Sequence, residues 1–258
     1  MSDSLLDPRI KLHKSLKIGE YHINNQGCRF KIIDYLSYDK CTIQFEDDTM
    51  PIYENINYHN ILTGAVKNDY LPIRYKTGFI GKGIYNTLKD KKAAQTWSGM
   101  LERCYDQKRQ LSQPTYKDCS VTKEWHNFQN FAAWYEKNYI DGYVLDKDIL
   151  KKGNKIYSPE TCCFVPQEIN NLFTNRSNYR NNLPIGVTTE NNNRTFRTTF
   201  TKNKKQIYLG SFKTPEEAFQ AYKIAKEVYI KEVAELWKSR IANNVYEALI
   251  NYNVEITD

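Results

Sequence analysis

The chain has 258 residues, a formal net charge of +7, and 40% hydrophobic and 14% aromatic residues. This composition favours folded cores over disorder, and the length allows about two or three small domains. The excess of Lys and Arg favours nucleic acid over acidic small molecules as a partner. No apolar run is long enough to span a bilayer, and the first residues lack the apolar core of a signal peptide. We therefore expect a cytoplasmic protein with no membrane partner.

Six cysteines occur, and none forms a CxxC pair. Disulfides are not expected in a reducing compartment, and this spacing supports structural zinc only weakly. Two alternatives remain. Either Cys104, Cys119 and Cys162 meet at a metal ion, or the cysteines are buried free thiols, which we favour.

Residues 1–66 contain short apolar runs, among them Cys28–Tyr35 and Lys40–Phe45, separated by turn signals. Short strands at close spacing predict a small twisted β-barrel, similar in pattern to Tudor-like barrels. An acidic turn and the lack of a basic cluster favour binding another protein, or capping the next domain, over binding nucleic acid. In residues 67–90, glycines interrupt any periodicity. A plain connector is favoured there over a loop that follows a phosphate backbone.

From Lys91 the pattern becomes helical, and a second helix is predicted over residues 127–139. The apolar stripe of the first helix includes Trp97, Met100 and Leu101. We expect the aromatic residues of both helices to form the core of a middle domain, residues 91–173, rather than to stack on bases.

Two acidic residues follow a strand-like run in the second half of this domain. Val144 and Leu145 end in Asp146-Lys147-Asp148; a Lys/Gly/Asn loop, a second apolar run and a short helix with Asn170 follow. A strand, a loop, a strand and a helix in this order bring Asp146, Asp148 and Asn170 together. Metal binding by the two aspartates is weighed evenly against ordinary turn or salt-bridge roles with nearby lysines.

The segment from Trp97 to Phe173 resembles the HNH, or ββα-metal, nucleases in the form found in phage homing-type endonucleases. The resemblance is carried by W..MLERCYD, by TYKDCSVTKEWHNFQNF and by LDKDIL..GNK.YSPETC.FVP..IN. It implies Mg²⁺ or Mn²⁺ held by Asp146, Asp148 and Asn170, to stabilise the leaving 3′ oxygen, and a general base that activates water.

The chain departs from that family at the base. Where the family has Asp-His, this sequence has Asp146-Lys147, and its four histidines lie outside the motif. Three alternatives follow. Lys147 acts as the base with a strongly lowered pKa, His126 reaches in from outside the motif, or the site is degenerate and not catalytic. We favour the third.

The carboxyl-terminal part alternates as a half-buried antiparallel sheet does. Phe196, Thr198 and Phe200 fall on one side of a strand; Ile207 and Leu209 are expected to join them from the next strand. The run Thr214-Pro215-Glu216-Glu217 predicts the capped start of a helix that covers this apolar face.

Residues 184–236 resemble the APETALA-type DNA-binding domain of plant ethylene-response factors, which also occurs fused to mobile and phage nucleases. The carriers are Gly186-Val187, the strand from Phe196, the run Tyr208–Phe212 and the run Thr214–Tyr222. The resemblance implies a three-stranded sheet that enters the major groove of double-stranded DNA. The positions that it assigns to DNA contact are Thr188, Glu190, Thr195, Arg197, Thr199, Thr201, Gln206 and Tyr208, and the basic residues Arg194 and Lys204 are added to them by charge.

Several of these positions carry Thr, Gln or Tyr where the plant domains have Arg or Trp. Arg contacts to guanine are therefore expected to be fewer, and the GC-rich target of the plant domains is not assumed. A basic, solvated sheet without a ligand is the alternative.

Together these patterns predict an α+β protein. Its predicted order is a small barrel, a connector, a degenerate HNH-like domain, a basic linker (174–183), the three-stranded sheet packed on one helix, and a helical tail (237–258). The tail is expected to pack on the middle domain or to form a homodimer contact. The function expected is that of a sequence-specific DNA-binding protein and metal-dependent endonuclease, in the host cell of a phage or mobile element. The alternative is a catalytically inactive regulator or phage inhibitor.

Overall fold

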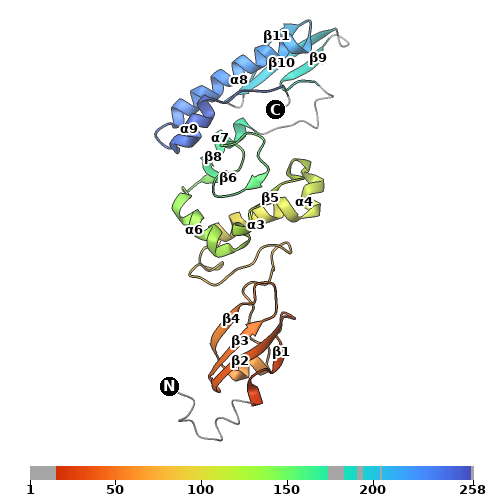
Figure 1. Ribbon diagram of the computed structural model, residues 1–258. Coiled ribbons are helices and arrows are strands. Elements are labelled where there is room, and N and C mark those ends of the chain that lie inside the picture. Colours follow the sequence, from red (N-terminus) through yellow and green to blue (C-terminus); the bar gives the residue numbers. More distant parts are fainter. Residues whose placement is uncertain (1–15, 174–182, 191–193, 204, 257–258) are drawn as a thin grey trace. The chain divides into compact units, whose positions relative to one another are not determined.

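The computed structural model describes residues 16–173, 183–190, 194–203 and 205–256 (Figure 1). The described chain is mixed helix and sheet, as the α+β class predicts. It divides into two compact units, one of Met1–Tyr105 with Lys123–Ala132 and one of Asp106–Thr122 with Ala133–Asp258. Among the helices described, none combines the length and the apolar character needed to cross a membrane.

The first unit begins with an antiparallel sheet in the order β1-β2-β3-β4. Its strands are β1 (Tyr21–Ile23), β2 (Arg29–Ser37), β3 (Lys40–Phe45) and β4 (Ile52–Ile56), and the short helix α2 (Tyr58–Leu62) follows. Inward residues such as Phe30, Ile32 and Ile43 are fully buried. The predicted barrel is not closed in the described strands, since β1 pairs with β2 alone and β4 with β3 alone. The sheet is therefore open, with β1 and β4 as its two edge strands among the described residues.

The segment 67–90 is packed rather than loose. The side chain of Gln129 donates to the carbonyls of Ile80 and Tyr85 and accepts from the Tyr85 N–H. A Cβ at Gly78 would lie 2.4 Å from the side chain of Leu101, so this close approach requires glycine. Glycines in this segment led to the prediction of a plain connector. In the structure, Gly78 instead permits close packing against the helix that follows.

Those helices are α3 (Lys91–Tyr105), α5 (Lys123–His126) and α6 (Phe128–Asn138), which confirms the two predicted helices. Trp97 and Trp125 are almost completely buried, and the Trp97 indole donates to the Trp125 carbonyl at 2.7 Å. Trp97 also packs on Phe128 and Trp125 on Phe131. These aromatic residues are core, as expected.

The second unit contains α4 (Gln107–Ser112), a 3-10 turn at Pro114–Tyr116, and two small sheets. β5 (Ser120–Val121) runs parallel to β7 (Ile156–Tyr157), and β6 (Tyr143–Asp146) runs antiparallel to β8 (Cys163–Pro166). Helix α7 (Gln167–Leu172) follows β8 directly.

The same unit ends in a three-stranded antiparallel sheet in the order β11-β10-β9. Its strands are β9 (Val187–Glu190), β10 (Thr195–Lys202) and β11 (Lys205–Phe212). Helix α8 (Pro215–Trp237) lies along one face of the sheet (Figure 1), and α9 (Asn243–Ile250) packs against α8. The predicted capping box is present, because Thr214 accepts from the Glu217 N–H and the Glu217 carboxylate accepts from the Thr214 N–H.

One continuous core joins this sheet and helix to the strands β6 and β8 and to α7. It includes Val165 and Ile169, Phe200 of β10, Ile230 of α8 and Leu249 of α9. The indole of Trp237 donates to Glu168 at 2.8 Å, and the Tyr143 hydroxyl donates to the Arg240 carbonyl at 2.8 Å. Of the two alternatives for the tail, packing on the predicted middle domain is therefore observed.

Candidate nucleic-acid interface

The face of the carboxyl-terminal sheet opposite α8 gathers the side chains that the sequence assigns to DNA contact. The strand register pairs Thr188 with Arg197, Glu190 with Thr195, Thr199 with Tyr208, and Thr201 with Gln206. The neighbouring positions on β10, Thr198 and Phe200, are buried under α8. Because side chains alternate along a strand, the eight predicted positions share the outward face. Each of them is exposed or half-buried.

A β-bulge in β11 shapes this face. Thr198 pairs with Gly210 while Thr199 pairs with Tyr208, so Leu209 is an extra residue in β11. Gly210 has φ +139°, and a Cβ there would lie 3.1 Å from the Phe212 ring. The bulge turns both Tyr208 and Ser211, three residues apart, to the outward face.

Ser211 was not among the predicted contacts, although it lies within the face. Its hydroxyl lies 3.0 Å from the Tyr208 hydroxyl and donates to Glu190 at 2.6 Å. The isolated glycine inside a strand pattern is the signal that could have indicated the bulge. Ile207 was expected on the apolar face; it pairs with Phe200 but stays 38% exposed.

Short polar contacts fix the orientation of the outward side chains. The amide of Gln206 donates to the Thr199 hydroxyl at 3.0 Å. The Arg197 guanidinium lies 5.1 Å from the centroid of the Tyr208 ring, within range of a cation–π contact. Such exposed contacts contribute little to stability, on the order of 0.5–1 kcal/mol, but they preorganise the surface.

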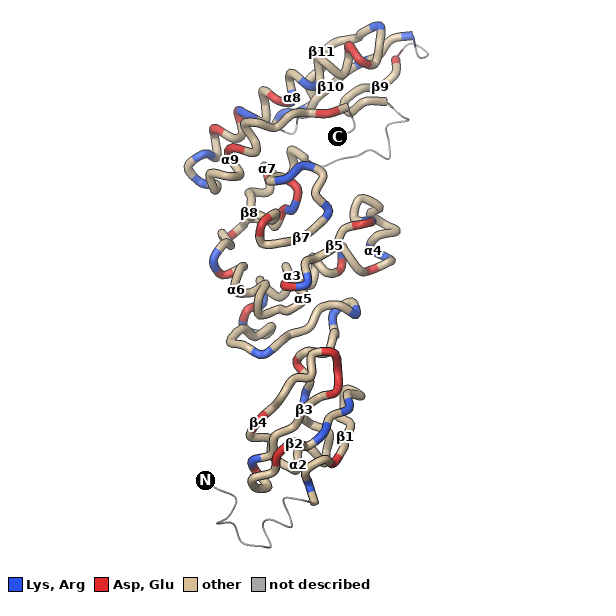
Figure 2. The backbone as a smooth tube through the Cα atoms, in the orientation of Figure 1, with Lys and Arg blue, Asp and Glu red and all other residues tan. Residues whose placement is uncertain are grey.

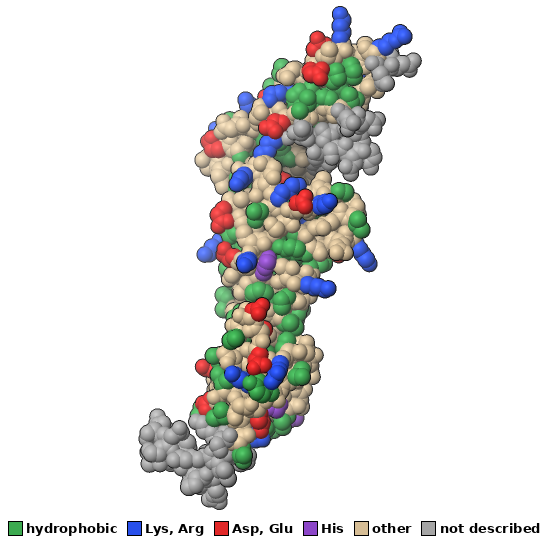
Figure 3. All heavy atoms as spheres, turned by 45° about the vertical axis from the view of Figure 1, so that its right-hand side comes forward, with side chains coloured by type: hydrophobic (Ala, Val, Ile, Leu, Met, Phe, Trp, Pro, Cys, Tyr) green, Lys and Arg blue, Asp and Glu red, His purple; other side chains and the backbone are tan. Residues whose placement is uncertain are grey.

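The charge on this face is modest. Arg197 is exposed on β10 and Arg194 is exposed just before it, whereas Lys202 and its strand partner Lys205 belong to the helix side, where Lys202 pairs with Glu232. Lys204 and the predicted linker residues 174–182 lie outside the described residues. In the view of Figure 3, Lys and Arg side chains are interspersed with acidic ones rather than gathered in one patch. The outward face thus offers hydrogen-bonding groups as well as charge.

The second predicted site is the loop after β6, where acidic and basic residues follow one another closely (Figure 2). Asp146, at the end of β6, accepts through Oδ1 from the N–H groups of Asp148 and Ile149, at 2.9 and 2.8 Å. Burial, together with the neighbouring charge of Asp148, raises the pKa of Asp146 to about 6. Asp146 is thus a turn-forming carboxyl that is costly to ionise.

Lys147 is only 8% exposed, and its side chain bonds two parts of this loop. Its Nζ donates to Asp148 at 2.8 Å and to the Asn154 carbonyl at 3.1 Å. Asn154 in turn donates to the carbonyls of Lys147 and Ile156, both at 2.7 Å, so it stabilises the turn. Burial lowers the pKa of Lys147, but its hydrogen bond to Asp148 and the charge of that group outweigh burial and raise the pKa. A general base would require a shift in the opposite direction.

Two further residues were predicted for this site, and one of them, Asn170, lies on α7, which packs against β6. Asn170 is half-buried in α7, where its backbone carbonyl accepts from Phe173. His126 ends α5 in the first unit, with its Nε2 3.4 Å from the hydroxyl of Tyr105. The structure thus brings together Asp146, Lys147 and Asp148, which are adjacent in sequence.

Both aspartates of the loop already have partners within the protein. One oxygen of Asp146 is used by two backbone N–H groups, and Asp148 is bound by the ammonium of Lys147. Across the described ranges, no three His, Cys, Asp or Glu side chains are grouped so as to hold a metal ion, and this includes the predicted cysteine set. The six cysteines are free, and five of them are buried. Burial raises the pKa of Cys162 and of Cys163, which keeps both thiols protonated.

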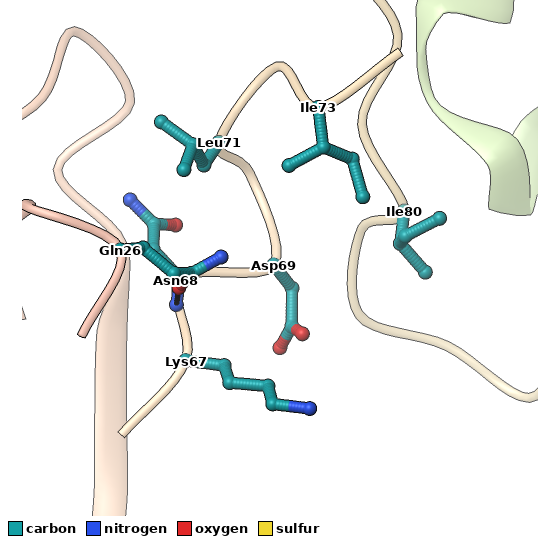
Figure 4. A pocket seen from close by; sticks show the side chains of 7 residues that line it. All are labelled: Gln26, Lys67, Asn68, Asp69, Leu71, Ile73 and Ile80. Carbon is teal, nitrogen blue, oxygen red and sulfur yellow. Dashed lines mark hydrogen bonds between the residues drawn. The ribbon is translucent and has the colours of Figure 1, made fainter. Parts of the chain in front are cut away.

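A pocket of about 330 Å³ lies in the first unit, and none of the predicted site residues lines it. Figure 4 shows Ile73 and Ile80 on one side of it and Gln26 and Asn68 on the other. The Asn68 N–H donates to Gln26, and the Asn68 amide donates to Asp47. The side chains of Gln26 and Asn68 are thus hydrogen-bonded within the protein. The surface that lines the pocket is largely apolar.

Comparisons of the chain with models of protein families, with curated proteins and with solved structures gave no match.

Proposed function

We propose that the protein binds double-stranded DNA through the outward face of β9, β10 and β11. The observation that carries the proposal is the strand register, which gathers polar side chains on one face while α8 covers the other. A β-ribbon fits the major groove of B-DNA, where base edges present hydrogen-bond donors and acceptors.

The side chains on this face suit base edges and phosphates better than a protein surface. Arg197, Gln206 and the threonine hydroxyls offer hydrogen bonds, and Tyr208 is 55% exposed. Protein interfaces usually have an apolar centre, which the side chains of this face do not provide. The net charge of +7 supplies the long-range attraction to DNA.

The loop after β6 serves a structural role in this proposal. The buried ammonium of Lys147 links Asp148 to Asn154 and so closes the loop without another cation. We infer a DNA-binding protein on a nuclease-like scaffold, in which the loop after β6 does not work as a catalytic site.

A second candidate function is phosphodiester hydrolysis, and one observation favours it. Asp146 and Asp148 lie close enough for the charge of Asp148 to raise the pKa of Asp146, and perturbed carboxyls of this kind cluster at functional sites. Incubation of the full chain with duplex DNA in Mg²⁺ or Mn²⁺, beside Asp146→Ala, separates the two candidates. Cleavage that disappears in the variant supports the nuclease, whereas binding without cleavage supports the proposal.

Binding itself is tested by titrating a labelled duplex with the full chain at increasing salt. Affinity should fall steeply, because phosphate contacts release counterions. Arg197→Ala should weaken binding by about 1–3 kcal/mol. The control is Lys231→Ala, which removes one charge from an exposed position of α8. A flat salt response, or equal effects of the two variants, would contradict the proposal.

A further inference from the structure

The orientation of Gln206 on the outward face bears on which bases the sheet prefers, and this inference rests on the proposed DNA binding. The Gln206 side-chain nitrogen carries two N–H groups, one of which is donated to the Thr199 hydroxyl at 3.0 Å. Thr199 is held beside it by the pairing of β10 with β11. Gln206 is exposed, so its second N–H and its carbonyl oxygen remain available to a ligand as one donor and one acceptor.

This pattern matches one base edge better than the others. In the major groove, adenine presents an acceptor, N7, beside a donor, the N6 amino group, whereas guanine presents two acceptors, N7 and O6. An amide that offers one donor and one acceptor forms both bonds with adenine. With guanine it forms one bond, and the amide oxygen faces the O6 oxygen of guanine, which is also an acceptor and repels it. We propose that Gln206 reads an adenine and that Thr199 makes this reading selective by holding the amide in place.

The neighbour of Gln206 supports the same base pair. Thr201 is the cross-strand partner of Gln206 and is exposed on the same face. Side chains of directly paired residues lie about 5 Å apart at Cβ, so the Thr201 methyl is within reach of the same or the next base pair. The methyl group of thymine is an apolar contact for such a side chain. Gln206 and Thr201 together therefore favour an A·T pair.

Arg197 has a different role on this face. Its guanidinium is stacked over Tyr208 and offers donors alone, which suits guanine or phosphate. The adenine preference is therefore assigned to Gln206 and not to the cationic side chain of the sheet.

The test is selection of bound sequences from a random duplex library by the full chain, followed by affinity measurements on the selected duplex and its single-base variants. Gln206→Ala should reduce discrimination at one A·T position by about 5- to 150-fold, which corresponds to about 1–3 kcal/mol. Thr199→Val keeps the shape of the side chain but removes the hydroxyl, and it should reduce discrimination at the same position. Arg197→Ala should leave the preference at that position in place while weakening affinity.

Each outcome decides a different question. Selected sequences whose A·T preference disappears in Gln206→Ala support the inference. Duplex binding with G·C at every selected position, or with an A·T preference that Gln206→Ala leaves unchanged, overturns the inference and leaves DNA binding intact. Failure of the wild-type chain to bind any duplex overturns the proposed function itself.

Discussion

The ammonium nitrogen of Lys147 lies 2.8 Å from the carboxylate of its neighbour, Asp148, although Lys147 is buried and Asp148 is partly exposed. The same nitrogen binds the Asn154 carbonyl seven residues later. One buried cation thus ties the two ends of the loop after β6 together.

Lys147→Met should lower the free energy of unfolding by about 1–3 kcal/mol, because the Asn154 carbonyl loses its donor and Asp148 loses its partner. The larger loss typical of a fully buried pair is not expected, since Asp148 remains in contact with water. Urea denaturation measures the effect. Lys151→Met, at an exposed neighbouring position, is the control and should change stability by less than about 0.5 kcal/mol. Equal effects of the two substitutions would show that the buried ammonium does not hold the loop.

Asp146 predicts a pH dependence of stability. Its pKa is raised to about 6 in the folded protein, so the folded state binds a proton more tightly than the unfolded state does. The stabilisation from this group is present at low pH and is lost as the pH rises through about 6. Asp146→Asn keeps an oxygen for the two backbone N–H groups but cannot ionise. Denaturation at pH 5 and at pH 7 should therefore show a smaller difference in the variant than in the wild type, and an unchanged difference would assign the pH dependence to other groups.

Gly210 is predicted to be required for the bulge of β11. Its φ of +139° and the close Phe212 ring leave no relaxed place for a Cβ, so Gly210→Ala should destabilise the protein by about 1–3 kcal/mol. Gly99→Ala is a control of opposite sign. Gly99 lies inside α3 with open space around it, and this change should stabilise the protein by about 0.5–1 kcal/mol. Thermal unfolding of both variants checks the pair, and a neutral Gly210→Ala would mean that the bulge tolerates a side chain.

Tyr208 should contribute to DNA binding through its ring and through its hydroxyl. Tyr208→Ala removes the surface over which Arg197 stacks and should weaken duplex binding by about 1–3 kcal/mol. Tyr208→Phe keeps the ring but loses the contact with Ser211, and we expect a smaller loss. Measurements of both variants by fluorescence anisotropy test this order. A loss in Tyr208→Phe as large as that in Tyr208→Ala would assign the contribution to the hydroxyl alone.

The outward face of β10 was predictable because its alternation is strict from Thr195 to Thr201, and alternation alone fixes which side chains share a face. The bulge of β11 was not predicted. Its one extra residue moves every side chain beyond it to the opposite face from the one that strict alternation predicts, and Ser211 was missed for that reason.

The closing of the loop after β6 could not be derived from sequence either. The substitution of Lys147 for the histidine of the resembled motif is visible in the sequence, but its partner Asn154 is found only once the loop geometry is known. The open amino-terminal sheet is a further difference from the predicted barrel. A sequence pattern predicts the individual strands, but it does not show whether the two edge strands pair with each other.

Helix α8 has 23 residues, and its two halves serve different neighbours. Ala218 and Tyr222 belong to the half that covers the sheet, whereas Trp237, at the other end, bonds to Glu168 of α7. A fragment cut at residue 236 would expose Ile230, Val233 and Ala234, which are buried in the intact protein. Attempts to transplant this sheet and helix onto another protein would therefore need to carry α7 and α9 along with them, and a chimera built from the sheet and helix alone should aggregate.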